Sequence, residues 1–370
     1  MKSKILATIV LSLILINCNK DNSTENNNDI NNGPFTLTIF NEVLYYDGYA
    51  STVNEPVPAD IYRISNSKYV TKISENDLQK IGNKLNLEIV VKAACDNYDR
   101  IGNVFLSFIN KGETYDQENI ISKIEVARFI TPFMDKNKTP NEVPYSFEIN
   151  NVAKILTDLE FKSKYDFWIE FDIFGVPYAA NAQIAGCAGK NYTFYGSLKF
   201  ITSEKEENNS QFLKSVACFD SLNNFKNTDA IGKTIRTFSI EVPSKLTNAA
   251  IYLITSNHGS NAGGEEYIRR NHYVYFDGNL IATYKPGGKS CEPFRQYNTQ
   301  GNGIYGANPR TESEWTSWNN WCPGDVIPIR VYDLGNLDAG NHTFKIEVPD
   351  AKFFDAQGNF PLSAYIQGNI

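Results

Sequence analysis

The sequence predicts an all-β protein built from antiparallel sandwiches. Three observations favour this class: the apolar segments are short, most of them alternate between apolar and polar residues, and β-branched and aromatic residues dominate them. Aromatic residues make up 13% of the 370 residues, with 21 Tyr and 23 Phe against two Met. A chain of this length is too long for one ordinary core, so we expect two domains of middling size.

Ten segments carry the strand pattern. The expected strands cover residues 85–94, 102–110, 123–131, 165–175, 192–202, 233–242, 249–256, 272–284, 326–334 and 342–348. Helical periodicity is weak outside residues 151–159. The polar run that begins at residue 202 has the composition of a linker, and no strong repeat relates the two halves. We expect an N-terminal domain at 34–203, a linker at 204–211 and a C-terminal domain at 212–370.

The N-terminus has the features of a bacterial export signal. The basic start MKSK precedes an apolar run, ILATIVLSLILI, that is too short for a comfortable membrane span and ends near Cys18. We interpret residues 1–18 as a lipoprotein signal with Cys18 acylated. Asn17 is unusual before that cysteine, so secretion with another cleavage site is the alternative. Residues 19–33 are expected to be a disordered tether, which would leave the lipid as the protein's membrane contact in the cell envelope.

Charge and metal-binding residues exclude several classes of function. The chain has 35 basic and 42 acidic residues and a net charge of −7, which gives no footprint for nucleic acid or an anionic membrane. A neutral or sugar-like partner fits better. The chain has three histidines and no C-x-x-C spacing, so we expect no zinc or copper site and no cofactor. Five cysteines besides Cys18 leave one thiol over if the others pair after export.

Two segments concentrate acids. Along residues 166–172, Asp166, Trp168, Glu170 and Asp172 share one face of the expected strand, because side chains alternate. This pattern alone is somewhat more typical of a solvated outer face than of a site. The glycine-rich run SNHGSNAGGEEYIRRNH, residues 256–272, combines acids, arginines and two histidines, and a mobile hairpin loop is an equally good interpretation of it.

A third short segment raises the same choice. The stretch CDNYDR, residues 95–100, follows an apolar run and has the composition of a solvated turn. No G-x-S-x-G elbow occurs in the chain, and no cysteine stands in a recognisable Cys/His context. Carboxylates are therefore the groups left for catalysis.

Four ordered motifs resemble those of a known family. The segments CDNYDRIGNVFLSF, VARFITPF, EEYIRRNH and NNWCPG follow one another in this order, and together they resemble the peptide-N-glycosidase F amidases over most of residues 85–335. The resemblance implies two eight-stranded antiparallel jelly rolls side by side, with the site at their interface. It also implies cleavage of the amide between the innermost GlcNAc of an N-glycan and asparagine, in N-glycosylated proteins or peptides, by a monomer.

The resemblance implies three catalytic acids. Asp99 falls on the family's principal aspartate, Glu266 on the second essential carboxylate and Glu170 on the third acid. Because neither a metal nor a nucleophilic side chain is expected, water must attack, with Asp99 accepting its proton and Glu266 holding the water or the linkage. Glu170 would orient the other two. The expected substrate contacts are Arg100, Tyr98, Tyr267, Arg270 and His258, with Arg100 also the expected stabiliser of the oxyanion.

The chain also departs from the family pattern. Tyr98 stands where a tryptophan is known, Gly264 and Ile268 replace the cysteines that bracket the second glutamate, Trp318 replaces an arginine, and Asp172 replaces a sugar-contacting tryptophan. The three acids are retained while the sugar-contacting positions differ. An exported amidase is the first hypothesis, and a catalytically inactive carbohydrate-binding lipoprotein of the same fold is the alternative. A glycosidase that uses two carboxylates on the sugar is a distant third.

The resemblance also bears on the cysteines. Cys291 and Cys322 match the family's bridge in the second domain and are expected to be paired. For the first domain we expect a bridge between Cys95 and Cys187, which leaves Cys218 as the free thiol.

Overall fold

The computed structural model describes residues 34–205, 210–224, 229–259, 264–301, 304–353 and 358–370. The expected signal segment with Cys18, the tether, and residues 206–209 of the expected linker lie outside these ranges. No helix in the part that is described is long and apolar enough to cross a membrane.

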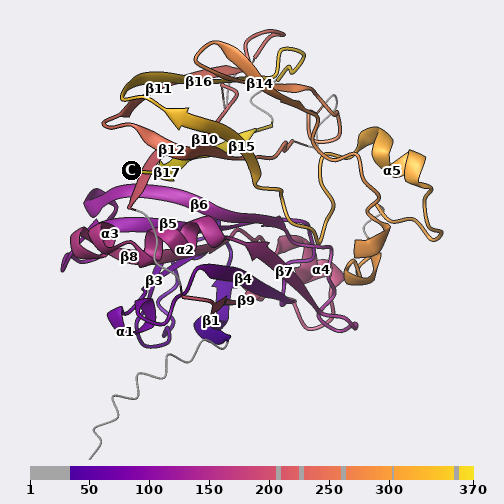
Figure 1. The fold of residues 1–370 in the computed structure, drawn as a ribbon. Coiled ribbons are helices and arrows are strands. Elements are labelled where there is room, and N and C mark those ends of the chain that lie inside the picture. Colours follow the sequence, from indigo (N-terminus) through magenta and orange to yellow (C-terminus); the bar gives the residue numbers. More distant parts are fainter. Residues whose placement is uncertain (1–33, 206–209, 225–228, 260–263, 302–303, 354–357) are drawn as a thin grey trace, which may run out of the picture. The chain divides into compact units, whose positions relative to one another are not determined.

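Two antiparallel sheets form the first domain (Figure 1). One has the order β1-β9-β4-β7, and the other has the order β2-β3-β8-β5-β6. The strands are β1 (Phe35–Tyr46), β2 (Ile61–Ser65), β3 (Lys68–Lys72), β4 (Lys84–Ala93), β5 (Ile101–Asn110), β6 (Ile120–Ile130), β7 (Glu142–Glu148), β8 (Tyr165–Ile173) and β9 (Tyr192–Ser203). This sandwich has nine described strands and not eight, because the hairpin β2–β3 adds an edge strand to the second sheet.

The second domain is a sandwich of eight described strands. Its sheets have the orders β10-β17-β12-β15 and β11-β16-β13-β14. The strands are β10 (Gln211–Ser221), β11 (Ile235–Val242), β12 (Leu246–Thr255), β13 (His272–Phe276), β14 (Asn279–Tyr284), β15 (Arg330–Leu337), β16 (Gly340–Glu347) and β17 (Pro361–Asn369). The segment expected as one strand at 272–284 is a hairpin, because Asp277 and Gly278 have φ of 48° and 76°, as a two-residue turn between antiparallel strands requires.

Each sandwich encloses its own core. Alternate residues of β4, among them Leu87, Ile89 and Val91, are fully buried against the inner face of β8, where Phe167 and Phe171 lie. The second core gathers inward side chains of β12, β16 and β17. This alternation confirms the two β-sandwiches predicted from the sequence, since one face of each strand is apolar and inward.

Helices are short and lie in connections. They are α1 (Glu75–Leu78), α2 (Asn150–Thr157), α3 (Leu159–Lys164), α4 (Tyr178–Gln183) and α5 (Glu312–Trp318), with 3-10 turns η1 (Gln117–Asn119) and η2 (Glu292–Tyr297). The helix expected at 151–159 is present as α2 and buries Val152, Ala153, Ile155 and Leu156. The helix α5 begins with a complete capping box between Thr311 and Glu314, which satisfies its first free N–H groups.

Strand β6 joins the two domains. It is the last strand of its sheet, and it packs against β10 and β17 of the second domain (Figure 1). An antiparallel bridge pairs Phe129 with Val326, with backbone hydrogen bonds of 3.0 Å from Ile130 N to the oxygen of Asp325 and 2.8 Å from Ile327 N to the oxygen of Arg128. The segment that follows residue 319 is thereby fixed beside the end of β6.

Candidate active site

The loop that carries Asp99 connects β4 to β5, and its first half is buried. Cys95, Asp96 and Asn97 are at most 1% exposed, and Cys95 is bridged to Cys187. The carboxylate of Asp96 accepts hydrogen bonds from Arg100 Nε at 2.7 Å, Val176 N at 2.6 Å and Tyr98 N at 2.9 Å. The solvated-turn interpretation of this segment is therefore wrong, because Asp96 ties it into the fold.

Thr131, at the end of β6, fixes the backbone on both sides of Asp99. Its hydroxyl accepts from Arg100 N at 2.8 Å and donates to the oxygen of Tyr98 at 3.2 Å. Its own N–H donates to the oxygen of Arg100 at 2.8 Å. The ring of Tyr98 packs edge-on against Phe133, with centroids 5.7 Å apart. The side chain of Asp99 therefore projects from a backbone with little freedom, which is the condition for a positioned acid or base.

Glu266 belongs to the second domain and lies in the glycine-rich segment after β12. Its carboxylate accepts from Gly259 N at 2.8 Å. Below it, the side-chain amide of Asn320 donates to the backbone oxygen of Glu266 and to those of Glu265 at 3.0 Å and Ile268 at 3.3 Å. These bonds hold the turn at the positions where the family pattern has cysteines and this chain has Gly264 and Ile268.

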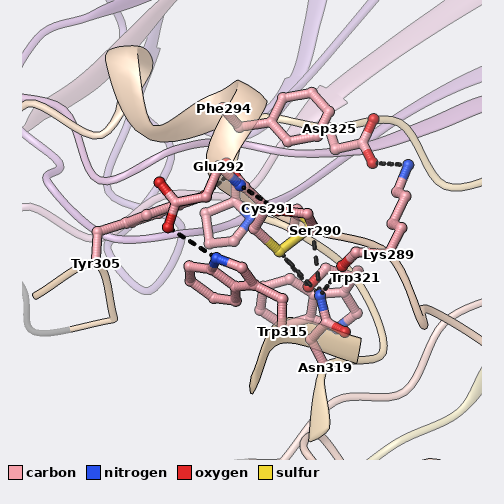
Figure 2. The surroundings of a disulfide bond; sticks show 12 residues. Lys289, Ser290, Cys291, Glu292, Phe294, Tyr305, Trp315, Asn319, Trp321 and Asp325 are labelled. Atoms are coloured by element: carbon pink, nitrogen blue, oxygen red, sulfur yellow. Dashed lines mark hydrogen bonds and ion pairs between the residues drawn. A yellow bond between two sulfur atoms is a disulfide. The ribbon is translucent and has the colours of Figure 1, made fainter. Parts of the chain in front are cut away.

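The segment that supplies Asn320 is itself held by the disulfide Cys291–Cys322 (Figure 2). Figure 2 shows Asn319 beside the two sulfur atoms and Trp315 donating its indole N–H to Glu292, at 2.8 Å. Lys289 pairs with Asp325 at the other side of the bridge. The disulfide and these polar contacts make the NNWCPG segment a rigid support for Glu266. Both expected cystine pairs are thus present, and Cys218 is the free cysteine of the described chain.

Trp321 extends this support toward His258. Its indole N–H donates to the oxygen of Asn257 at 2.8 Å, and its ring stacks on His258 at a centroid distance of 5.8 Å. His258 also shares a 2.7 Å hydrogen bond with the Ser256 hydroxyl. Burial, together with the positive charge of Arg128, lowers the pKa of His258 to about 3. His258 is therefore neutral near pH 7 and cannot act there as a cationic acid.

Asp99 and Glu266 lie close enough for the charge of Glu266 to act on the pKa of Asp99. Burial and, after it, the charge of Glu266 raise the pKa of Asp99 to about 7, and Arg100 opposes this rise. The pKa of Glu266 is also raised by burial, against the opposing hydrogen bonds from Gly259 and Tyr267. Tyr267 faces both carboxylates, and their charges add to the burial that raises its own pKa. The structure thus brings two of the three expected acids together, one from each domain.

The third acid lies elsewhere on the same sheet. Glu170 lies on β8 and is fully buried. It pairs with Phe105 of β5, which is four residues, or about 13 Å, along β5 from the first residue of that strand. It is flanked by Lys123 at 3.3 Å and Lys68 at 3.5 Å and accepts from the Ser107 hydroxyl. Burial alone would raise the pKa of Glu170, but the two ammonium groups together with the hydrogen bonds from Ser107 and Tyr115 outweigh it, so the pKa is lowered. The solvated-face interpretation of this strand is wrong.

Two expected substrate contacts are occupied by neighbouring acids. Arg270 forms a two-point ion pair with the buried Glu265, with both N–O distances 2.9 Å. Arg100 is tied to Asp96 through its Nε, and its guanidinium lies 5.5 Å from the centre of the Tyr98 ring. Tyr267 is 38% exposed beside Glu266. Of these three, Tyr267 is the one whose polar group faces the acid pair most directly.

Several residues at the site lie within the motifs quoted above but were not predicted as site residues. Asp96, Thr131 and Asn320 act through hydrogen bonds to backbone atoms that are distant in the chain, which no local pattern reveals. Asn257 is fully buried, and neither atom of its side-chain amide has a hydrogen-bond partner among the described residues. It lies two residues before Gly259, the donor to Glu266. Asn257 belongs to the glycine-rich run of residues 256–272, and that run was the one feature of the sequence that pointed to it.

No group of three or more His, Cys, Asp or Glu residues within the described ranges could hold a metal ion. The polar groups around the acid pair are the phenol of Tyr267 and the guanidinium of Arg100.

Family models agree with this architecture. Residues 36–188 match the peptide-N-glycosidase F N-terminal domain, and residues 226–367 match the peptide-N-glycosidase F C-terminal domain. The chain belongs to the peptide-N-glycosidase F family. A search of curated protein sequences gave no match.

Solved structures of the family share the fold at low sequence identity. PNGF-II in a P21 crystal form has 22% identity and a TM-score of 0.66 over 90% of this chain and 65% of its own. PNGase F, "a glycosylasparaginase from Flavobacterium meningosepticum", has 14% identity and a TM-score of 0.56 over 91% of this chain and 96% of its own. The structure described as peptide-N(4)-(N-acetyl-beta-D-glucosaminyl) asparagine amidase has 13% identity and a TM-score of 0.57. The chain spans about two thirds of PNGF-II.

Proposed function

We propose that the protein is an exported amidase that cleaves the amide between the innermost GlcNAc of an N-glycan and asparagine. The observation that carries this proposal is the meeting of Asp99 and Glu266 from two domains, each with a raised pKa. Two close carboxyl groups in a poorly solvated site do not ionise equally easily, so the pKa of one of them rises to a range in which it can take up and return a proton near neutral pH. Membership of the peptide-N-glycosidase F family and the names of the solved relatives support the substrate class.

In the proposed reaction, ionised Asp99 accepts a proton from water as the water oxygen attacks the side-chain carbonyl carbon of the glycosylated asparagine. The carbonyl oxygen becomes negatively charged, and the N–H groups of Arg100 that Asp96 does not bind would stabilise it. Glu266 holds the linkage, and Asp99 returns the proton that it took from water to the departing nitrogen. The C–N bond then breaks, leaving aspartate on the peptide and a glycosylamine.

Glu170 has a supporting place in this proposal. Its carboxylate is shared by Lys68, Lys123 and Ser107, and it lies about 13 Å along β5 from the strand's start, so we do not assign it contact with the reacting atoms. It would keep the face of the sheet near the site rigid, or meet the glycan farther from the amide.

Export and lipid anchoring remain proposals that rest on the N-terminal sequence. The signal-like residues 1–18 support export, with Cys18 as the acylated residue. The two disulfides also favour an oxidising compartment, since such bonds rarely persist in the cytosol. Labelling cells with a fatty-acid analogue should mark the wild type and spare Cys18→Ala; equal labelling of both would contradict the anchor.

The reaction is tested with an N-glycopeptide and mass analysis of its products. Wild type should release the glycan and convert asparagine to aspartate. Asp99→Asn removes the base while keeping its shape and should lower turnover by on the order of 10² to 10⁴-fold. Glu266→Gln should lose a comparable amount and Glu170→Gln less. Asp333→Asn, the same change at an exposed carboxylate of β15, is the matched control and should retain full activity.

The products separate the competing functions. Cleavage between the sugars, with one GlcNAc left on unchanged asparagine, would indicate a glycosidase. Glycan retention on a column without any release would favour the catalytically inactive carbohydrate-binding protein. The separation of Glu170 from the other two acids is the observation that keeps this second candidate in view. Full activity of Asp99→Asn would overturn the assignment of the base.

A further inference from the structure

The first domain has a large groove on the far side of Glu170 from Asp99. It has a volume of about 870 Å³ and is bounded by β1, by the hairpin β2–β3, by α1 with the residue before it, and by the loop 112–115. Trp168 of β8 forms part of its wall. In the register of the sheet, Trp168 pairs with Ser107, six residues or about 20 Å along β5 from the strand's start beside Asp99. The groove is therefore distant from Asp99, and it adjoins Glu170, which is hydrogen-bonded to Tyr115 of the groove wall.

Three aromatic rings line this groove together. Trp168 lies between Tyr62 and Tyr115, with centroid distances of 5.8 Å and 5.3 Å. Tyr62 stands on the edge strand β2 and is 55% exposed, whereas Trp168 is 5% exposed. A large exposed ring that is backed by a buried one offers a rigid flat surface, and the apolar C–H face of a sugar ring packs well on such a surface.

The polar groups of the groove favour a neutral, hydroxyl-rich ligand. The indole N–H of Trp168 is buried and has no hydrogen-bond partner among the described residues. Asp60 lines the groove with a carboxylate that would accept hydrogen bonds from hydroxyl groups and repel an anion, whereas the carboxylate of Asp77 is already bonded to Ser74 and Lys80. The groove's two cations are already engaged: Arg63 donates to the backbone oxygens of Val53 and Glu55. Lys72 pairs with Asp166 at 3.3 Å.

We propose that this groove is a second carbohydrate-binding site, in which a pyranose ring of a neutral oligosaccharide stacks on Tyr62 and its hydroxyl groups bind the carboxylate of Asp60. A small movement of Trp168 would bring its unpartnered N–H to the same ligand. This site would hold a glycoconjugate by a sugar about 20 Å from the acids. The proposal concerns binding and does not depend on the amidase activity being present.

The test is calorimetric titration of the full chain with two defined probes, mannopentaose and chitopentaose. Wild type should bind at least one of them saturably, and Tyr62→Ala should weaken that binding about tenfold through loss of the stacking surface. Trp168→Phe keeps a ring and removes the N–H, so it should weaken binding less than Tyr62→Ala. Tyr49→Ala is the matched control, because Tyr49 is 80% exposed in the same domain and does not line the groove.

Each outcome decides the proposal. Saturable binding that Tyr62→Ala weakens, that Tyr49→Ala preserves and that Asp99→Asn preserves supports the second site. Absence of saturable binding for both probes, equal binding by Tyr62→Ala, or loss of binding in Asp99→Asn overturns it. Thermal unfolding of each variant identifies any misfolded protein, and in that case Tyr62→Ser replaces Tyr62→Ala. Glycan release by the wild type, measured in parallel, fails or succeeds independently of these titrations.

Discussion

Asp99 combines the two properties that a general base for amide hydrolysis needs near neutral pH. Its backbone is fixed on both sides by Thr131, and its pKa is raised to about 7. A base with a pKa near the operating pH is partly ionised there and still strong enough to take a proton. Burial contributes most to the rise, and the charge of Glu266 comes next. Burial and the nearby acid of the other domain together set the protonation behaviour of Asp99.

The pH dependence of the wild type should report this pKa. Because the ionised form of Asp99 is the base, kcat/KM should increase with pH up to about 7 and level off above it. In Glu266→Gln the neighbouring negative charge is gone, so the pKa of Asp99 falls and the residual activity should begin to rise at lower pH. The measurement is glycan release from a short glycopeptide between about pH 5 and pH 9. The same midpoint in both proteins would show that the two acids are not coupled.

At the scale of elements, the apolar pattern predicted most strands of the two sandwiches and missed β1, β2, β3, β7, β10 and β17. Strand β17 was not predicted because Ser363 and Gln367 are buried and interrupt its apolar pattern. They are buried because Ser363 bonds Glu125 and Gln367 bonds Gln211. Strand β3 was not predicted either, and so Lys68, which lies on β3 beside Glu170, was not predicted as a neighbour of this acid. The pair Asp99 and Glu266 was predicted from the family motifs. The loop contacts that hold these two acids join residues far apart in the sequence, so the sequence pattern did not predict them.

Asn320 illustrates such a contact and provides a test at this scale. Asn320→Ala removes the amide that binds three carbonyl groups around Glu266, so the turn should loosen and kcat should fall roughly 10 to 10²-fold, with KM changed less. The acidic limb of the pH profile should also move to lower pH, because Glu266 then lies farther from Asp99 on average. Asn308→Ala, at an exposed loop position, is the control. A fall in thermal stability without a change in the pH profile would assign Asn320 a purely structural role.

At the scale of the whole molecule, a buried ion pair links the two sandwiches. Arg128 and Glu125 of β6 are both fully buried and bonded to each other at 2.7 and 2.8 Å. Arg128 also donates to Ser256 at 2.9 Å and to the oxygen of Pro361 at 2.8 Å, both in the second domain. Glu125 accepts from Ser363 on the same side. The first domain therefore supplies two buried charges, and groups of the second domain complete their hydrogen bonds.

Breaking this pair should be costly. Arg128→Met leaves Glu125 buried without its counter-ion, so we expect a loss of about 3–5 kcal/mol in the free energy of unfolding. The double variant Arg128→Met/Glu125→Gln removes the unpaired charge and should recover part of that loss. Lys80→Met, at an exposed pair with Asp77, should change stability by about 1 kcal/mol or less. Urea unfolding followed by tryptophan fluorescence measures all three, and a loss for Arg128→Met no larger than for Lys80→Met would contradict the link.

Cys218, the free thiol of the described chain, offers a way to measure how often this contact between the domains opens. Cys218 lies on β10 near Glu125, Lys123 and Glu170 of the first domain, and burial, with help from the charge of Glu125, raises its pKa well above the usual range. A thiol in this state reacts slowly, because the thiolate is the reactive form. Separation of the sandwiches would expose it to water and lower its pKa toward the ordinary value. The rate at which Cys218 is alkylated should therefore report how often the two domains separate, and no label has to be introduced for this measurement.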